Sequence, residues 1–237
     1  MPIDVETTGN IGTISEIVRT LFGESAQTVD IVILLTILTL LPSILMMLTG
    51  FTRIIIVLSF IRQALGMQQT PPNQILIGLA LFLTFFVMQP VFSRVYDEAY
   101  VPFTEGEISQ DEFIERAMDP TRDFMFEQVF TTDMNFFISM ADIDIEFDSN
   151  GDLIHDSVPS SVLIPAFITS EVKHAMFIGF IIYIPFIVVD MIVASTLMSM
   201  GMMMLPPAMI SLPFKVLLFV MVDGWQLIIG SLIQTFY

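Results

Sequence analysis

Four long runs of apolar residues constrain this chain more than any other feature. They occupy residues 31–48, 75–92, 175–200 and 208–233. A helix that spans a lipid bilayer needs about 20 mainly apolar residues, and all four runs are near or above that length. No alternating pattern of barrel strands is present, and a helix satisfies its own backbone hydrogen bonds inside lipid. The sequence therefore predicts an all-α membrane protein with four apolar helical blocks, arranged as two long helical hairpins.

Charge is sparse in this chain and concentrated in one segment. Only 14% of the 237 residues are charged, against about 25% in typical soluble domains. The formal net charge is −17, and 17 of the 25 acidic residues lie between Asp97 and Asp156, together with two basic ones. This segment is the one candidate for a soluble domain. The negative charge argues against nucleic-acid binding, and the absence of cysteine excludes disulfides and thiolate metal sites.

These patterns divide the chain into four parts. Residues 1–30 form an N-terminal segment that lacks the basic start, apolar centre and small-residue cleavage site of a signal peptide. A first helical hairpin is predicted over residues 31–96, and a second over residues 171–237. Between them, residues 97–170 are predicted to form a small acidic and mainly helical segment.

Two arginines set the predicted topology. Arg53 and Arg62 flank the turn of the first hairpin, and cytoplasmic loops are enriched in Lys and Arg. The turn is therefore placed in the cytoplasm, with the acidic segment and both termini on the other side of the membrane. Both arginines are also candidates for contacts between subunits.

The acidic segment begins with a helical pattern over residues 109–141. We expect Asp119-Pro120 to interrupt this helix, because proline disfavours helical backbone at the residue before it. Phe124 and Phe137 belong to a set of aromatic residues at helical spacing. They are interpreted as a small packed core or a contact face between subunits, rather than as a cofactor site.

Residues 142–156 alternate with a period of two around Asn150-Gly151, a dipeptide typical of hairpin turns, and predict a β-hairpin. A calcium loop is not indicated there, because its glycine is misplaced and its twelfth position is Pro159. Elsewhere the chain has no phosphate-binding glycine loop and no zinc-protease or hydrolase motif. We therefore predict no catalytic residue, no metal and no cofactor.

Two turns share one pattern. Residues 66–72 read GMQQTPP and residues 201–207 read GMMMLPP, so both fit G-M-x-x-x-P-P. A glycine can end one helix and a proline can begin the next. Two hairpin tips of similar geometry are predicted, with coincidence as the alternative. The tip residues are Gly66, Pro71, Pro72, Gly201, Pro206 and Pro207.

Two ionisable residues lie inside apolar blocks, where a charge costs several kcal/mol unless it is paired or hydrated. Counted from the second tip at about 1.5 Å per residue, Asp190 lies about 20 Å and Lys215 about 17 Å along antiparallel helices. An ion pair that fixes the register of the hairpin is predicted, with a proton relay as the alternative. Glu171 and Asp223 are candidates for contacts at interfaces or between subunits.

The second tip carries Met202, Met203 and Met204 in succession. Methionine is flexible and polarizable, so it fills irregular spaces without a fixed geometry. Three consecutive methionines at a turn cannot all face one core. Composition alone leaves two interpretations, which are gap-filling between helices and a compliant seal around something of variable shape.

Several stretches resemble one family. LTGFTRIIIVLSFIRQALGMQQTPP, IPFIVVDMIVASTLMSMGMMMLPP and LPFKVLLFVMVDGWQLIIGSL are similar to the FliP family of flagellar type III export gate proteins. The resemblance implies a ring or shallow helix of about five copies, with FliQ-type and FliR-type partners, forming a pore for unfolded export substrates. Met202, Met203 and Met204 would then form a gasket that closes the pore. It also implies a cleavable signal sequence and helices packed above the membrane plane, while the stretch over residues 142–160 departs from the expected shorter connection.

We therefore expect a non-enzymatic core subunit of this export gate, in the bacterial inner membrane at the flagellar basal body. An ion-coupled secondary transporter with Asp190 as its coupling site is one alternative, since such proteins are also built from repeated hairpins. The equivalent subunit of a virulence injectisome is another.

Overall fold

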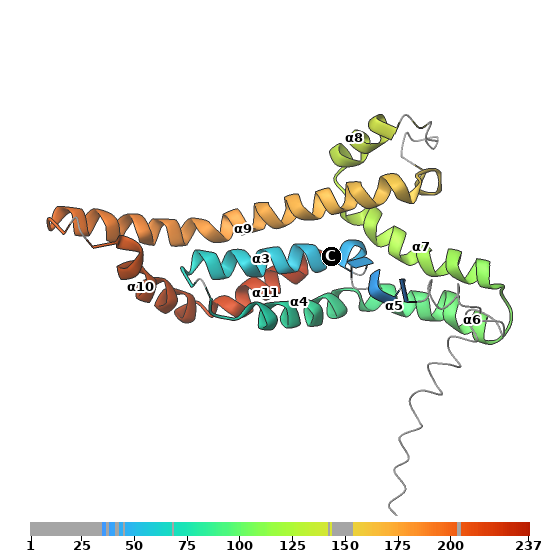
Figure 1. The fold of residues 1–237 in the computed structure, drawn as a ribbon, viewed down its shortest axis with the longest axis horizontal. Helices are drawn as coiled ribbons and strands as arrows, with labels where there is room; N and C mark the ends of the chain where they lie inside the picture. Colours follow the sequence, from blue (N-terminus) through green and yellow to red (C-terminus); the bar gives the residue numbers. More distant parts are fainter. Residues whose placement is uncertain are drawn as a thin grey trace, which may run out of the picture.

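Every regular element that the structure describes is a helix, as the sequence predicts (Figure 1). The structure is a computed structural model. It describes residues 35–36, 38–40, 43–44, 46–67, 69–141, 143, 154–202 and 205–237. Eight of the 18 residues of the first apolar run lie outside these ranges, as do most of the predicted β-hairpin over residues 142–156 and two of the three tip methionines.

Helix α3 (Phe51–Ala64) lies at the centre of the fold. Ile54, Val57, Leu58 and Ile61 recur at helical spacing and are completely buried, which is the pattern of a core-facing helix. The helix packs against α4 (Asn73–Val87) and most extensively against α9 (Ser160–Ser199). The apolar face of α3 therefore makes it the helix around which α4 and α9 pack.

The contact between α3 and α9 is unusually close at one point. A Cβ atom added to Gly179 of α9 would lie 2.5 Å from the ring of Phe60 on α3. Nearby, the Tyr183 hydroxyl lies 3.4 Å from the carbonyl oxygen of Gln63, in the last turn of α3. The glycine therefore permits the approach, and Tyr183 marks the level at which α3 ends beside α9.

Helix α9 has 40 residues and would be about 60 Å long, twice the roughly 30 Å of a bilayer's hydrocarbon core. It begins at Ser160 and continues through residue 170. The predicted boundary between residues 170 and 171 falls inside this continuous helix. Among the described residues, α9 is the one helix that is long and apolar enough by itself to cross a membrane.

Two further candidate spans are bent. Helix α4 is followed by α5 (Gln89–Val95) and its continuation to Thr104 at an angle of 57°, and α10 (Pro207–Met221) meets α11 (Gly224–Gln234) at 66°. The described residues thus contain one to three candidate spans, depending on whether each bent pair counts as one. The sequence predicted runs of sufficient length, but it did not reveal the bends.

The bend between α10 and α11 has a local cause. Asp223 has left-handed backbone at φ 51°, and it precedes the first residue of α11. A Cβ added to the next residue, Gly224, would lie 2.4 Å from the ring of Phe219. The Phe219 ring is itself held between Phe186 and Trp225, with centroids 6.4 and 5.4 Å away. The bend is therefore fixed by packing as well as by the backbone.

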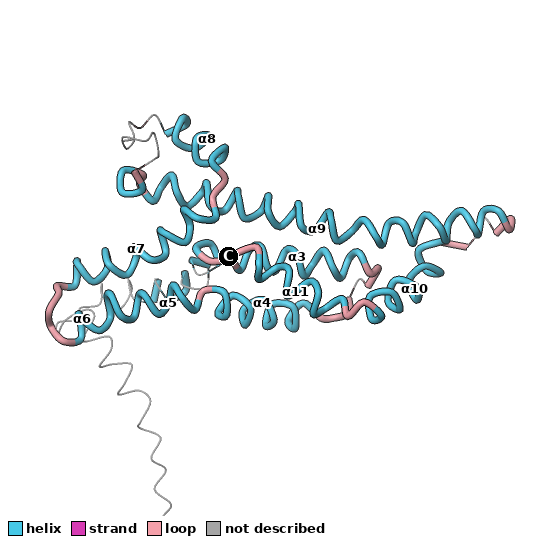
Figure 2. The backbone as a smooth tube through the Cα atoms, turned by 180° about the vertical axis from the view of Figure 1, so that it is seen from behind, coloured by secondary structure: helices cyan, strands magenta, loops and turns pink. Residues whose placement is uncertain are grey.

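After α5, the chain continues through a π-helical turn (Tyr96–Tyr100) and α6 (Val101–Thr104) to α7 (Gln110–Gln128) and α8 (Thr131–Ala141). Figure 2 shows these elements of the acidic segment at one end of the molecule. A short 3-10 turn (His155–Ser157) precedes α9.

The predicted break at Asp119-Pro120 is wrong. Pro120 lies inside α7, where it is buried, and the helix continues to Gln128. A proline inside a helix costs about 3 kcal/mol, but α7 packs against both α5 and α9. These tertiary contacts outweigh the local preference.

Candidate functional site

The two predicted tips close in the same way. At the first tip, the Gly66 amide donates to the Gln63 carbonyl at 2.9 Å and the Met67 amide donates to the Arg62 carbonyl at 3.1 Å. At the second tip, the corresponding donors are Gly201 and Met202, and their acceptors are the Met198 and Leu197 carbonyls at 3.1 and 3.0 Å. Both glycines have positive φ, 78° and 75°. This is the Schellman arrangement, in which a left-handed glycine ends a helix.

The prolines of each tip precede or begin the following helix. Pro72 is the residue before α4, whereas Pro206 precedes α10 and Pro207 is its first residue. The two tips therefore agree at the glycine and differ by one residue in where the next helix starts. Arg62 reaches across the first tip, where its guanidinium donates to the Asn73 side chain at 2.5 Å.

The methionine tip lies at the far end of α9 (Figure 1). Met198 is 63% exposed, Met200 66% and Met202 43%. Met203 and Met204, the other two predicted gasket residues, lie outside the described residues. The described methionines of the tip therefore pack on no core within this chain, which is what a contact surface requires.

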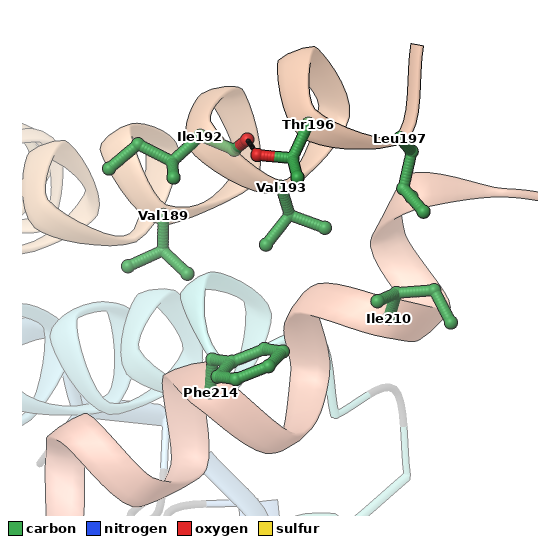
Figure 3. A pocket seen from close by; sticks show the side chains of 7 residues that line it. All are labelled: Val189, Ile192, Val193, Thr196, Leu197, Ile210 and Phe214. Carbon is green, nitrogen blue, oxygen red and sulfur yellow. Dashed lines mark hydrogen bonds between the residues drawn. The ribbon is translucent and has the colours of Figure 1, made fainter. Parts of the chain in front are cut away.

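Behind this tip, α9 and α10 do not pack tightly. Figure 3 shows an apolar pocket between them, with a volume of about 380 Å³. One side is formed by α9 and the other by α10. Its lining residues are Val189, Ile192, Val193, Thr196, Leu197, Ile210 and Phe214.

The structure brings Asp190 and Lys215 together. The Lys215 ammonium donates to Asp190 Oδ2 at 2.6 Å, and the Ser211 hydroxyl donates to Asp190 Oδ1 at 2.5 Å. The Lys215 side chain is only 7% exposed, whereas Asp190 is 38% exposed. Ser211 lies one helical turn before Lys215, so both groups of α10 reach the same carboxylate of α9. Sequence reasoning missed the contribution of Ser211.

A second charged cluster lies in the core. The guanidinium of Arg53 on α3 binds both carboxylate oxygens of Glu171 on α9, with Nε 3.1 Å from Oε2. It also donates to the Gln128 side-chain oxygen at 2.9 Å and to the Thr235 carbonyl at 2.9 Å. Both charged side chains are completely buried. A buried ion pair of this kind is favourable only because its remaining donors are also satisfied.

The aromatic ring of Phe236 completes this cluster. It lies 4.0 Å from the Arg53 guanidinium carbon, in a cation–π arrangement. The backbone carbonyl of Phe236 accepts a hydrogen bond from the Gln128 side-chain amide at 3.2 Å. A Cβ at Gly50 would lie 2.5 Å from the ring. The cluster thus joins α3, α7, α9 and the residues after α11 in one place.

These contacts correct three predictions. Arg53, Glu171 and Phe124 were candidates for contacts between subunits, but all three are buried within one chain. The ring of Phe124 packs on those of Phe167 and Phe236, with centroids 6.0 and 6.4 Å away. Burial follows because α7 folds back onto α9, a contact that spacing in the sequence cannot show. Phe137 remains half-buried and Asp223 exposed, so these two stay available for an interface.

Helix α8 is attached to α9 through a polar cluster that the sequence analysis missed. The Asp133 carboxylate accepts from the Lys173 ammonium and, at 2.8 Å, from the Ser170 hydroxyl. That hydroxyl accepts from the Phe130 amide at 3.1 Å. Burial by itself would raise the pKa of Asp133, but these hydrogen bonds outweigh it and hold the pKa below its ordinary value of 3.8.

Acid should therefore release α8. A carboxyl whose pKa is depressed by folding stabilises the fold fully above its unfolded pKa, and that stabilisation is lost as the pH falls below about 3.8. The expected loss is about 1 kcal/mol, because Lys173 is half-exposed. The chain has no cysteine, so spin labels at Asn135→Cys and Met176→Cys can report the distance between α8 and α9 as the pH is lowered from 6 to 3.

Asp133→Asn is the matched control for this titration. It keeps the size of the side chain but removes the charge, so its distance distribution should already be broad at neutral pH and should change little with acid. Superimposable titrations of the two proteins would show that Asp133 does not hold α8.

Comparison with known proteins assigns the chain to a family. Residues 34–232 match the family model described as the FliP family. The chain belongs to the FliP family. The resemblance noted in the sequence is thereby confirmed, and it extends over both tips, the Asp190–Lys215 pair and the Arg53–Glu171 pair. FliP proteins are components of flagellar export rather than members of a known enzyme family.

Individual relatives are similar over most of their length. The chain is 56% identical over 209 residues to the flagellar biosynthetic protein FliP of Pectobacterium carotovorum subsp. carotovorum, with 88% of this chain and 79% of the relative covered. It is 51% identical over 211 residues to the flagellar biosynthetic protein FliP of Bacillus subtilis, covering 89% of this chain and 93% of the relative.

Proposed function

We propose that this chain is a core subunit of the flagellar type III export gate, in which several copies form a pore for unfolded export substrates. About five copies would assemble with FliQ-type and FliR-type subunits in the bacterial inner membrane, at the flagellar basal body. Membership of the FliP family carries this proposal. The two helical hairpins and the topology predicted from Arg53 and Arg62 belong to it as well.

The exposed apolar surface supports assembly into a multimer. Only 11% of the most hydrophobic 18-residue window of α9 is buried within the chain. Phe177 and Phe180 of α9 are 67% and 62% exposed, and Phe82 of α4 is 78% exposed. Lipid or neighbouring subunits must cover these side chains, and a single chain has too little polar surface to line a passage.

The geometry of the second tip supports a gasket. The turn presents Met202, which is 43% exposed, at the end of α9 and directly after the left-handed Gly201. Flexible thioether side chains adapt to irregular shapes. A ring of such tips would close around an empty pore and yield to a passing chain.

The alternatives are less well supported. A transporter that uses Asp190 as its coupling site needs a carboxylate that can bind and release an ion, whereas Asp190 is held by Lys215 and Ser211. The injectisome alternative is disfavoured because the relatives from Pectobacterium carotovorum and Bacillus subtilis carry flagellar names.

Replacing Met202, Met203 and Met204 together by Ala should make the assembled gate leak small ions in its resting state. The smaller side chains would leave an opening at the tip that the methionines fill. Single-channel conductance of the purified assembly in a planar bilayer measures this directly. Met176→Ala is the control, because Met176 is an exposed methionine near the middle of α9, away from the tip. If the triple variant conducts no more than the resting unsubstituted assembly, these methionines do not form a gasket.

A further inference from the structure

One acidic residue of the apolar half of the chain has no partner. Glu171 and Asp190 are both paired, but the Asp223 side chain makes no hydrogen bond or ion pair among the described residues. It is exposed beside Met221 and Val222, which are 77% and 53% exposed. A carboxylate on such an apolar surface is costly unless a cation or water satisfies it. The surface that covers these side chains is therefore expected to supply a cation.

The cations of the described part of the chain leave one candidate. Five of them already bind carboxylates, and Arg122 uses both terminal nitrogens on the Ser160 hydroxyl and two carbonyls. Arg62 is different, because it binds only the neutral Asn73 and Pro71 oxygens, and through a single nitrogen. The five paired cations are Arg53, Arg94, Arg116, Lys173 and Lys215.

Arg62 and Asp223 lie at the same end of the helical core but do not meet within one chain. Measured from the contact between Arg53 and Thr235, Arg62 is about 14 Å along α3 and Asp223 about 18 Å along α11. Both views of the fold place the α10–α11 bend at the end of α3 that carries the first tip (Figures 1 and 2). The same proximity brings Leu212 of α10 within 3.9 Å of a Cβ built on Gly66.

The surface around Asp223 is shaped to receive another segment. Its exposed side chains continue along one face of α11 and line an open groove of about 420 Å³. Small and amide-bearing residues are typical of faces where apolar helices pack and form hydrogen bonds. The groove is lined by Val222, Asp223, Gln226, Leu227, Gly230, Ser231 and Gln234.

We propose that Asp223 of one copy pairs with Arg62 of the next, so that the first tip of each chain docks against the α10–α11 bend of its neighbour. This contact rests on the proposed multimer. The contact joins one patch on the first copy to a different patch on the second, so the interface is head-to-tail. Interfaces of this kind close into a ring or continue as a helix. Asp223 of one copy and Arg62 of the next would then satisfy each other around the assembly.

Crosslinking between copies tests the contact while leaving both charges in place. One tagged chain carries Gln69→Cys at the first tip, and an untagged chain carries Gln226→Cys one turn after Asp223. The two chains are co-produced with their export-gate companions. A short bis-maleimide should link tagged to untagged chains. Adding Asp223→Asn, which keeps a residue tolerant of left-handed backbone, should reduce the linked product about tenfold.

Two controls separate the outcomes. Glu115→Cys in place of Gln226→Cys provides an exposed position on α7 and should give no link. Native mass spectrometry of the same samples reports copy number independently. Multimers that give no link between positions 69 and 226, or a link only to a companion chain, overturn the contact but leave the proposed function standing. Strictly monomeric material in the presence of the companions overturns the proposed function itself.

Discussion

Arg53→Leu should destabilise this protein strongly, by roughly 3–5 kcal/mol. The substitution leaves the Glu171 carboxylate buried without a counter-charge, and it removes the donor that the Gln128 side chain and the Thr235 carbonyl share. The measurable results are a lower melting temperature in detergent, followed by the fluorescence of the single tryptophan, and reduced accumulation in the membrane.

The double variant Arg53→Leu with Glu171→Leu tests the cause. Removing both charges leaves no buried ion, so the double variant should be more stable than either single variant, although Gln128 and Thr235 still lose a partner. Arg116→Leu is the matched control, because Arg116 pairs with Glu112 on the surface, where both side chains are more than 40% exposed. It should change stability by about 0.5 kcal/mol or less. Additive losses in the double variant would show that the two charges do not depend on each other.

Reversing the charge of either Asp190 or Lys215 should abolish assembly, and reversing both should restore it. Each single reversal places two like charges side by side at a position where Lys215 is almost completely buried. The cost is roughly 1–3 kcal/mol or more, since a buried charged group loses its partner. Copy number by native mass, with the two companion subunits present, measures the outcome.

Ser211→Ala provides a graded comparison for the charge reversals. It removes one hydrogen bond to Asp190 and leaves the ion pair intact, so a loss of about 1 kcal/mol is expected, with assembly retained. A double reversal that assembles no better than the single ones would mean that position, rather than the exchange of charge, determines the role of these residues.

The elements that sequence reasoning located correctly depend on local rules. Apolar length predicted the helices, and the spacing of glycine and proline predicted both tips. Counting residues from the second tip placed Asp190 and Lys215 at similar depths, and the structure brings them together. These inferences succeed because antiparallel neighbours joined by a short turn have a register that the turn itself fixes.

Two of the errors concern contacts between elements far apart in the chain. Arg53 and Glu171 are separated by 118 positions, with the whole acidic segment between them, so no turn relates their depths. The continuation of α7 through Pro120 likewise depends on α5 and α9, which pack against it. Local sequence preferences predict the free-energy cost of a residue such as Pro120 inside a helix. Only the tertiary structure shows which packing contacts offset that cost.

Because α9 extends well beyond the end of α3, the methionine tip can move relative to the core when α9 bends. Helix α3 ends beside Tyr183 of α9. Two residues further toward the methionine tip, α9 contains Pro185. From there α9 continues for about four turns accompanied by α10, with an apolar pocket between the two. Proline is a common point of helix bending. A rotation of about 10° at Pro185 would swing the tip by about 4 Å, while the residues around Arg53 stay in place.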